Sequence, residues 1–288
     1  MVNLAKQILI LFKLRIGVAM MVTTGMGVAA TPGPAPSFWA MVLLLSAVLL
    51  AAGAAGGLNH YHDFDIDARM ERTKNRPFVT GKLVHSPLWL VLFAFLLVVP
   101  VLAVWRTINP MAAAFVFLGA FFYGVVYTVW LKRRTWLNIV IGGLAGSFAV
   151  LAGTAAVDPT LNPLALSLAF ILFLWTPPHF WSLAIALKDE YQVAGVPMLP
   201  VVAGQARAAR VVLANITLLV LASILPLFFG LGWLYLLGAM VGGGFFLYRG
   251  IQLVRTPVVM AAMGSFRASL VQLGLLVLCA SLDGLFVS

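Results

Sequence analysis

Nine runs of roughly 20 apolar residues, separated by short polar connections, divide almost the whole chain. The runs cover residues 16–34, 38–58, 87–105, 110–130, 136–157, 163–187, 211–230, 232–249 and 266–286. A helix of this length crosses the hydrocarbon core of a bilayer, and no connection is long enough to fold as a soluble domain. We therefore predict an all-α polytopic membrane protein, a nine-transmembrane-helix bundle in which residues 1–288 form a single membrane-embedded domain.

The distribution of charge indicates how such a bundle lies in the membrane. Hydrophobic residues make up 63% of the chain, and the net charge is +10, a value that in a soluble protein would suggest nucleic-acid binding. In the nine-span arrangement, however, 17 of the 18 lysines and arginines fall on one side, and only Arg106 falls on the other. The positive-inside rule then predicts a cytoplasmic N-terminus and explains the basic excess without a nucleic-acid partner.

The acidic residues are concentrated in two connections on the predicted cytoplasmic side. Six of the eight lie within residues 59–77 and 188–191, in a chain of which only 9% is charged. Carboxylates gathered beside lysines and arginines at the ends of apolar helices are suited to a divalent metal and a phosphorylated substrate. We therefore expect the functional site at the cytoplasmic end of the bundle.

The first acidic segment has the spacing of a metal site on one helix. Asn59, Asp63 and Asp67 are four residues apart, so on an α-helix they fall within an arc of about 80° and face one cavity. Asp65 is predicted to point roughly the opposite way. Magnesium prefers oxygen ligands and often uses one or two carboxylates with substrate phosphates, which fits this set. The alternative is a solvated helix end whose acids pair with nearby bases, namely Arg69, Arg72 and Lys74.

Two groups of basic residues accompany the acids. Arg72 and Arg76 follow within ten residues, and Lys132, Arg133 and Arg134 end a later apolar run. A diphosphate needs charge-assisted donors, and the planar fork of arginine matches phosphate oxygens. For the residues at 132–134, anchoring the topology of the chain is an equally good explanation.

The second segment begins inside the run at 163–187. Pro177 and Pro178 remove backbone donors and predict a kink, and His179 stands beside them between Trp175 and Trp181. An ionisable residue at membrane depth is a functional candidate by default, although a hydrogen-bonded structural histidine is also consistent with this pattern. Farther on, Asp189 is a candidate ligand for a second metal ion, and Tyr191 could hydrogen-bond a phosphate or a developing charge.

Three blocks of sequence, at 59–77, 127–143 and 173–202, together resemble the UbiA superfamily of intramembrane prenyltransferases. The first block resembles the superfamily in general. Trp175-Thr-Pro-Pro-His-Phe-Trp181 and Ala194-Gly-Val-Pro-Met-Leu-Pro200 resemble the branch that farnesylates heme B. The resemblance covers most of the predicted inner half of the molecule.

This resemblance implies transfer of the farnesyl group of farnesyl diphosphate to a vinyl group of heme B, with addition of water, giving heme O and diphosphate. It implies Mg²⁺ as cofactor and a multi-pass protein of the bacterial plasma (inner) membrane with its active site on the cytoplasmic side. It also implies membrane lipid around the protein and a downstream heme-modifying enzyme as partner. Carried over by position, the metal ligands are Asn59, Asp63, Asp67 and Asp189. The diphosphate-binding residues are Arg72, Arg76, Lys132 and Arg133. The catalytic residues are Asp63, Asp67, Asp189 and Tyr191, and the heme-binding residues are His179, Trp175 and Trp181.

Some positions depart from the pattern of that branch and leave alternatives open. His60 and His62 stand where other residues are usual, so either is an alternative to His179 as the ligand of the heme iron. Another UbiA-type transferase, acting on a quinone precursor or a lipid alcohol, is a second possibility, but the chain lacks a second Asp-x-x-x-Asp. A secondary transporter is the alternative from a different class; transporters hold their ionisable groups near the bilayer midplane, whereas here the acids lie at its edge.

Overall fold

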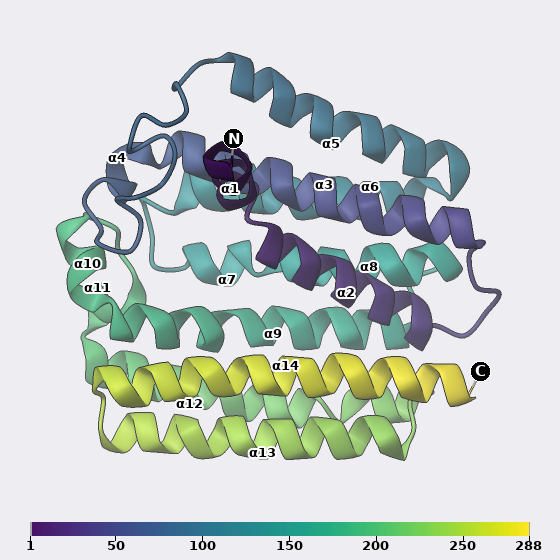
Figure 1. Cartoon of the computed structure of the whole chain (residues 1–288). Coiled ribbons are helices and arrows are strands. Elements are labelled where there is room, and N and C mark those ends of the chain that lie inside the picture. The colour runs from purple at the N-terminus through teal and green to yellow at the C-terminus, as the bar shows by residue number, and fades with distance from the viewer. Residues whose placement is uncertain (1, 288) are drawn as a thin grey trace.

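The computed structural model describes the backbone of residues 2–287 and the side chains of residues 5–286. Within that range the chain contains helices and no strands, and the long helices run side by side as one bundle (Figure 1). The first half consists of α1 (Val2–Leu11), α2 (Leu14–Ala30), α3 (Phe38–His62), α4 (Phe64–Asp67), α5 (Leu88–Thr107), α6 (Pro110–Phe121), the π-helix η1 (Phe122–Leu131), α7 (Asn138–Gly142) and α8 (Leu144–Val157). The second half consists of α9 (Pro163–Ala186), α10 (Lys188–Val193), α11 (Leu199–Ala203), α12 (Gln205–Ala222), the 3-10 helix η2 (Leu225–Phe229), α13 (Trp233–Arg255) and α14 (Val259–Val287).

The predicted all-α polytopic class is confirmed. By length and apolar composition, 8 helical segments among the described residues can cross a membrane, and up to 9 if the bent pair α1 and α2 is one span. The sequence-based boundaries differ from the observed ones mainly at the inner ends, where α3, α12 and α13 extend several residues beyond the apolar runs. The orientation of the termini relative to the cytoplasm stays a prediction.

The first span differs from the predicted run at 16–34. Lys13 adopts a left-handed backbone conformation with φ 47° and ψ 46°, which ends α1 and starts α2 at a bend of 54°. At its other end, α2 stops at Ala30 because the following Pro32 and Pro34 cannot continue a helix. The break places the Lys13 side chain inside the bundle, which matters for the site described below.

Small residues allow several helices to approach closely. A side chain at Gly153 would collide with the backbone of Thr24 on α2, and one at Gly57 would collide with the Phe93 ring on α5. Gly57 and Gly142, which lie in the glycine-rich stretches at 51–57 and 142–146, both make such contacts. This close packing brings α2, α3 and α8 together around the inner part of the bundle.

The two long polar connections lie at the same end of the bundle. In Figure 1, α4 and the pair α10 and α11 occupy the left end, although more than a hundred residues separate them in the chain. Between them, α9 runs without interruption through Pro177 and Pro178, so these prolines do not end the helix. The fold therefore gathers both acidic segments at one face.

Candidate active site

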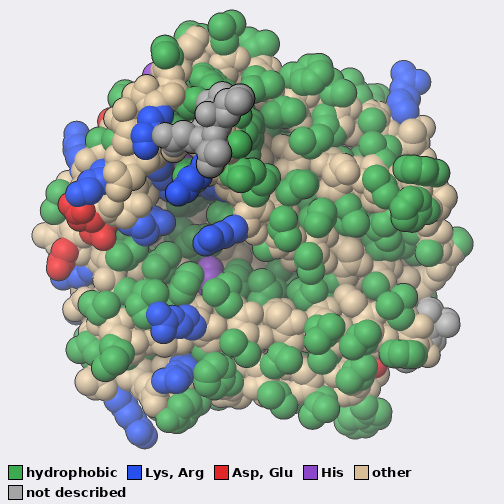
Figure 2. All heavy atoms as spheres, in the orientation of Figure 1, with side chains coloured by type: hydrophobic (Ala, Val, Ile, Leu, Met, Phe, Trp, Pro, Cys, Tyr) green, Lys and Arg blue, Asp and Glu red, His purple; other side chains and the backbone are tan. Residues whose placement is uncertain are grey.

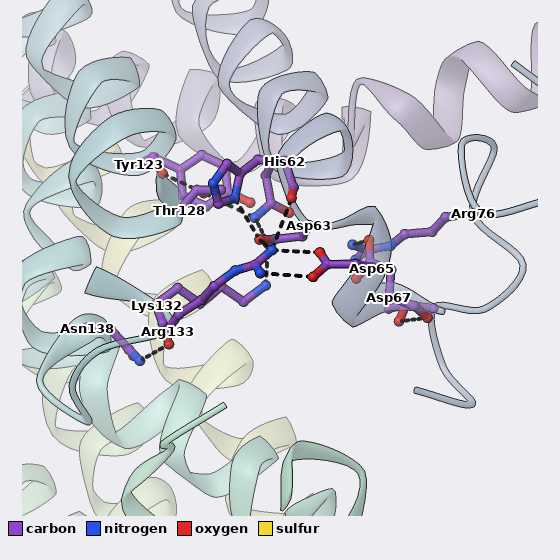
Figure 3. A network of polar contacts seen from close by, with 12 residues as sticks. His62, Asp63, Asp65, Asp67, Arg76, Tyr123, Thr128, Lys132, Arg133 and Asn138 are labelled. Atoms are coloured by element: carbon purple, nitrogen blue, oxygen red, sulfur yellow. Dashed lines mark hydrogen bonds and ion pairs between the residues drawn. The ribbon is translucent and has the colours of Figure 1, made fainter. Parts of the chain in front are cut away.

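A buried carboxylate stands at the centre of a polar network at this end of the bundle. Asp63 follows the last residue of α3 and is completely buried, with 0% of its surface exposed. Its Oδ2 accepts hydrogen bonds from Asn59 Nδ2 at 2.7 Å and from Lys132 Nζ. Figure 3 shows Lys132 and Arg133, 69 and 68 residues away in sequence from the acids they bind, pointing toward them. A buried ionised carboxylate requires such partners, because desolvation would otherwise favour its neutral form.

The amide of Asn59 connects Asp63 to Thr128 and Lys13. Its Nδ2 donates to Asp63 and, at 3.1 Å, to Thr128 Oγ1, while its Oδ1 accepts from Lys13 Nζ at 2.5 Å. The amide oxygen, which was predicted to be a metal ligand, is thus engaged by an ammonium group. In this arrangement Asn59 orients the neighbouring carboxylate, and metal ligation by Asn59 stays a prediction.

Lys13 is a site residue that the sequence analysis missed. Its Nζ donates to Asn59 Oδ1 and, at 2.8 Å, to the hydroxyl of Tyr123, and its carbon chain packs against Gly56, where a side chain would be tight. The signal in the sequence was that Lys13 interrupts an apolar stretch. A cation at membrane depth is usually functional, so Lys13 could have been taken as a candidate. The left-handed backbone at Lys13 could not be predicted from that signal.

The π-helix η1 supplies two of the cluster's partners, Tyr123 and Thr128, and Lys132 follows directly after it. Because a π-helix bonds residue i to residue i+5, Thr128 lies one turn after Tyr123, and its Oγ1 donates to the Tyr123 carbonyl at 2.9 Å. The same pattern continues at Lys132, whose backbone N donates to the Tyr127 carbonyl at 2.9 Å. Irregular helical turns of this kind are frequent at functional sites.

Asp67 forms a second buried ion pair. Its Oδ2 lies 2.5 Å from Arg76 Nη1, and only 2% of the residue is exposed. Burial raises the pKa of the Asp67 carboxyl above its ordinary value, while Arg76 and Lys132 oppose this shift. The ionised form of Asp67 therefore depends on nearby cations, and a divalent metal would serve it as well as a guanidinium does.

Asp65 is not directed away from the cluster, so that expectation was wrong. Arg133 binds both Asp65 oxygens, at 2.9 and 2.6 Å, and the same guanidinium lies 3.9 Å from Asp63. The helix ends at His62 and restarts at Phe64, and this break changes the direction of Asp65. The hydrogen bond from Arg133 lowers the pKa of Asp65. Arg133, predicted to bind diphosphate, is half-exposed and paired with Asp65.

The second acidic segment meets the first through Arg72. The Arg72 backbone N donates to Glu190 Oε2 at 3.2 Å, and its guanidinium approaches the Tyr191 hydroxyl. Tyr191 is buried, which raises its pKa, so it is neutral and able to donate a hydrogen bond. Asp189 is exposed, and its side chain makes no hydrogen bond or ion pair among the described residues. Glu190, rather than Asp189, is the acid that connects the segments.

The predicted heme-binding residues lie where α9 packs on α14. His179 Nδ1 lies 2.6 Å from Ser269 Oγ, and its ring stacks on that of Trp175 at a centroid distance of 4.3 Å. Trp181 packs against Trp136 instead. Of the alternative histidines, His60 is buried on α3, and His62 contacts Asp63 at 3.2 Å.

The donor set suits a magnesium ion that arrives with a phosphorylated substrate. Among residues 5–286, no three His, Cys, Asp or Glu side chains converge on a point that could hold a metal by themselves. Mg²⁺ does not require such a cage, because it keeps several waters and is commonly held by one or two carboxylates plus substrate phosphates. Asp63 and Asp67 provide two buried carboxylates, and Lys132, Arg76 and Arg72 provide nearby cations for the phosphates.

The surface next to this network is hollowed. Figure 2 shows a depression bordered above and below by Lys and Arg side chains, with one histidine side chain visible inside it. In Figure 1 the same region lies where α2 and α14 diverge, and these two helices cross at their other ends, at Ala29 and Gly284. A substrate could therefore reach the inner end of the bundle from the side.

Comparisons with known proteins give matches that cover almost the whole chain. The model of the UbiA prenyltransferase family matches residues 20–278. Protoheme IX farnesyltransferase 2 of Paramagnetospirillum magneticum is 56% identical over 275 residues, which are 95% of each chain. Protoheme IX farnesyltransferase 1 of Cenarchaeum symbiosum is 38% identical over 290 residues, covering 98% of this chain and 97% of that protein.

Solved structures share the fold at much lower sequence identity. Digeranylgeranylglyceryl phosphate synthase superposes with a TM-score of 0.79 at 18% identity, covering 98% of this chain and 99% of that chain. A UbiA homologue from Archaeoglobus fulgidus, bound to DMAPP and Mg²⁺, superposes with a TM-score of 0.70 at 16% identity, covering 94% and 99%.

Proposed function

The chain belongs to the UbiA prenyltransferase family, and from this premise we propose that it transfers the farnesyl group of farnesyl diphosphate to a vinyl group of heme B. Water adds in the same reaction, and the products are heme O and diphosphate. The observation that carries the proposal is the pair of buried carboxylates, Asp63 and Asp67, each held by a cation at the mouth of an apolar bundle. The names of the relatives, which match this chain almost end to end, supply the substrates.

The diphosphate binds among the cations of the cluster. Arg76 and Lys132 are paired with Asp67 and Asp63, and Arg72 bridges to the second segment. Asp63 and Asp67 would hold Mg²⁺, and Lys132 and Arg76 beside them would bind the phosphate oxygens. Bound Mg²⁺ supplies charge stabilisation for the departing diphosphate. Asn59 joins its ligands only if Lys13 releases the amide oxygen, and Asp189 is the remaining predicted ligand.

The chain's own side chains then govern the fate of the farnesyl group. The bond between its first carbon and the diphosphate oxygen breaks, and the diphosphate leaves with the electron pair. Stacked aromatic rings beside the cluster, Tyr123 and Tyr127 at 5.7 Å, face the allylic cation and keep water from it. The π electrons of the vinyl group form the new carbon–carbon bond, and a water oxygen bonds to the remaining vinyl carbon with loss of one proton. Tyr191, held by Arg72, donates to the leaving group.

The acceptor lies on the α9 side of the site. His179 and Trp175 line the acceptor site where α9 meets α14. Trp181 lies beside this site and packs against Trp136. The protein is a multi-pass membrane protein, and we place it in the bacterial inner membrane with this site on the cytoplasmic side. Its product is then available to a downstream heme-modifying enzyme on the same membrane.

The test is a direct assay of the purified protein. With farnesyl diphosphate, heme B and Mg²⁺, mass spectrometry should detect heme O, and chelation of the metal should abolish its formation. Parallel reactions receive an aromatic acid or a lipid alcohol as the only acceptor. Prenylation of one of these acceptors, with no farnesylated heme, would overturn the proposal and identify another member of the family.

A further inference from the structure

His179 has the surroundings of a metal-binding imidazole whose orientation is fixed. Only 7% of the residue is exposed. Its ring lies between Trp175, at 4.3 Å, and Phe266 of α14, at 4.5 Å, and both rings are nearly parallel to it. Phe180 contacts it edge-on at 5.0 Å. The imidazole therefore cannot rotate without displacing aromatic side chains from two helices.

The hydrogen bonds of Ser269 determine which nitrogen of His179 carries the proton. Ser269 Oγ lies 2.6 Å from the Phe266 carbonyl oxygen, to which it can only donate. A hydroxyl has one proton, so toward His179 the same oxygen acts as acceptor. Nδ1 of His179, at 2.6 Å, must then be the protonated nitrogen. The lone pair of the neutral ring is consequently on Nε2.

Nε2 of His179 is free and accessible. It makes no hydrogen bond with any described residue, and it is not among the enclosed polar atoms that lack a partner. A histidine that only ties two helices together would have both nitrogens satisfied or would turn the free one to bulk water. Here the free nitrogen belongs to a ring that is more than nine-tenths buried.

Ser269 is itself held in position from α9. Its backbone carbonyl accepts a hydrogen bond from Trp175 Nε1 at 2.9 Å, so the residue that flanks His179 also fixes its hydrogen-bond acceptor. Ser182 and Ser265 form a second contact between the same helices at 2.9 Å, one turn away. The register of α9 against α14 is thereby fixed at the level of His179.

We propose that Ser269 is a positioning residue that holds His179 in the Nδ1–H tautomer and presents Nε2 to the iron of a metalloporphyrin acceptor. The inference rests on the proposed function, which supplies the porphyrin. Histidines that bind metals generally donate their other ring N–H to an oxygen acceptor, which fixes the tautomer and raises the basicity of the ligating nitrogen. Axial ligation at this place orients the porphyrin ring, and with it the vinyl group that reacts.

The test is titration of the purified protein with heme B, followed by absorbance and by the iron–histidine vibration of the ferrous form. The wild type should bind with a histidine-ligated spectrum. His179→Gly should lose that spectrum and regain it with added imidazole. Ser269→Ala should weaken heme binding about 10-fold or more and alter the iron–histidine vibration, whereas Ser269→Thr, which keeps the hydroxyl, should largely retain both.

Ser265→Ala is the matched control. It removes a serine one turn earlier on α14, which bonds Ser182 and does not touch His179, so heme affinity and spectrum should equal those of the wild type. The inference is overturned if Ser269→Ala binds heme as the wild type does, if Ser265→Ala is equally impaired, or if His179→Gly keeps a histidine-ligated spectrum. Heme O formation by the wild type is measured separately, and its absence would contradict the proposed function rather than the role of Ser269.

Discussion

Heme O formation should depend on the negative charge of Asp63. Asp63→Asn keeps the size of the side chain but leaves Lys132 buried without a counter-ion. We expect heme O formation to fall at least about 100-fold, the scale of losing one electrostatic contact in an active site. Thermal stability should also fall, because breaking a buried ion pair typically costs about 3–5 kcal/mol. Asp158→Asn, in the connection after α8, is the control and should stay within about twofold of the wild type.

Lys13 and Asn59 should act as one unit. If Lys13 works by orienting the Asn59 amide, then Lys13→Met and Asn59→Ala remove the same interaction. Each should lower kcat/KM for farnesyl diphosphate, and the double variant should be little worse than the poorer single variant. The coupling energy expected for residues in direct contact is about 0.5–3 kcal/mol. Independent, additive losses would show that Lys13 contributes separately from Asn59.

The ion pair between Asp65 and Arg133 should affect stability only modestly and in a pH-dependent way. The folded-state pKa of Asp65 is lowered. The contribution of the Asp65 carboxylate to the stability of the fold is therefore present above its ordinary pKa of about 4, and it is lost as the pH falls through the folded-state pKa. Both side chains are more than a third exposed, so the effect is small. Unfolding temperatures of the wild type and Asp65→Asn should differ slightly near pH 7 and converge in acid. A constant difference would contradict this assignment.

The residues that gather in the cluster could largely be predicted from the sequence, but many of their contacts could not. Asp63, Asp67, Arg76 and Lys132 were recognisable because charge is rare in this chain and these residues cluster locally. The partners of Asn59 lie 46 and 69 residues away in sequence, so only the packed bundle reveals them. In the second acidic segment the sequence favoured Asp189 as the site residue, whereas in the structure it is Glu190 that contacts Arg72 of the first segment.

At the scale of helices, departures from ideal geometry explain what a regular pattern missed. On a straight α-helix, Tyr123 and Thr128 would point about 140° apart, whereas on the π-helix both side chains reach the network around Asn59. The break at Asp63 similarly redirects Asp65 toward Arg133. Apolar periodicity predicts where a helix lies, but it carries no information about a local change of hydrogen-bond register.

The crossing of α2 and α14 should be intolerant of added volume. A Cβ at Gly284 would overlap backbone atoms of Ala29 and Ala30, which cannot move aside as a side chain can. Gly284→Ala should therefore destabilise the protein by about 1–3 kcal/mol and lower its unfolding temperature in detergent. Gly274→Ala, in the same helix with no atom within 4 Å of the new carbon, should leave that temperature unchanged or raised. Equal effects of the two substitutions would contradict the close crossing.

At the scale of the whole molecule, the two ends of the bundle differ. The end that carries the acidic segments at 59–77 and 188–191 is called the chemical end, and the opposite end, with the connection between α8 and α9, is called the plain end. The acidic segments, their bases and the hollow between α2 and α14 share one end (Figures 1 and 2). The polytopic helical bundle and this division were predictable, because both follow from hydropathy and the positions of charge, while the predicted nine spans hold only if the bent pair α1 and α2 is one span. The fold alone does not give which of the two ends faces the cytoplasm, because orientation is defined relative to the membrane.

Cysteine labelling in cells expressing the full chain tests that orientation. In a Cys279→Ser background, Lys82→Cys lies in the exposed connection at the chemical end, and Thr160→Cys lies in an exposed turn at the plain end. Since 17 of the 18 basic residues belong to the chemical end, the positive-inside rule places it in the cytoplasm. A membrane-impermeant maleimide should then label Thr160→Cys in intact spheroplasts and label Lys82→Cys only after permeabilisation. Heme O formation by both variants verifies that they fold. The opposite labelling order would place the diphosphate site outside, where the charge distribution would have no topological explanation.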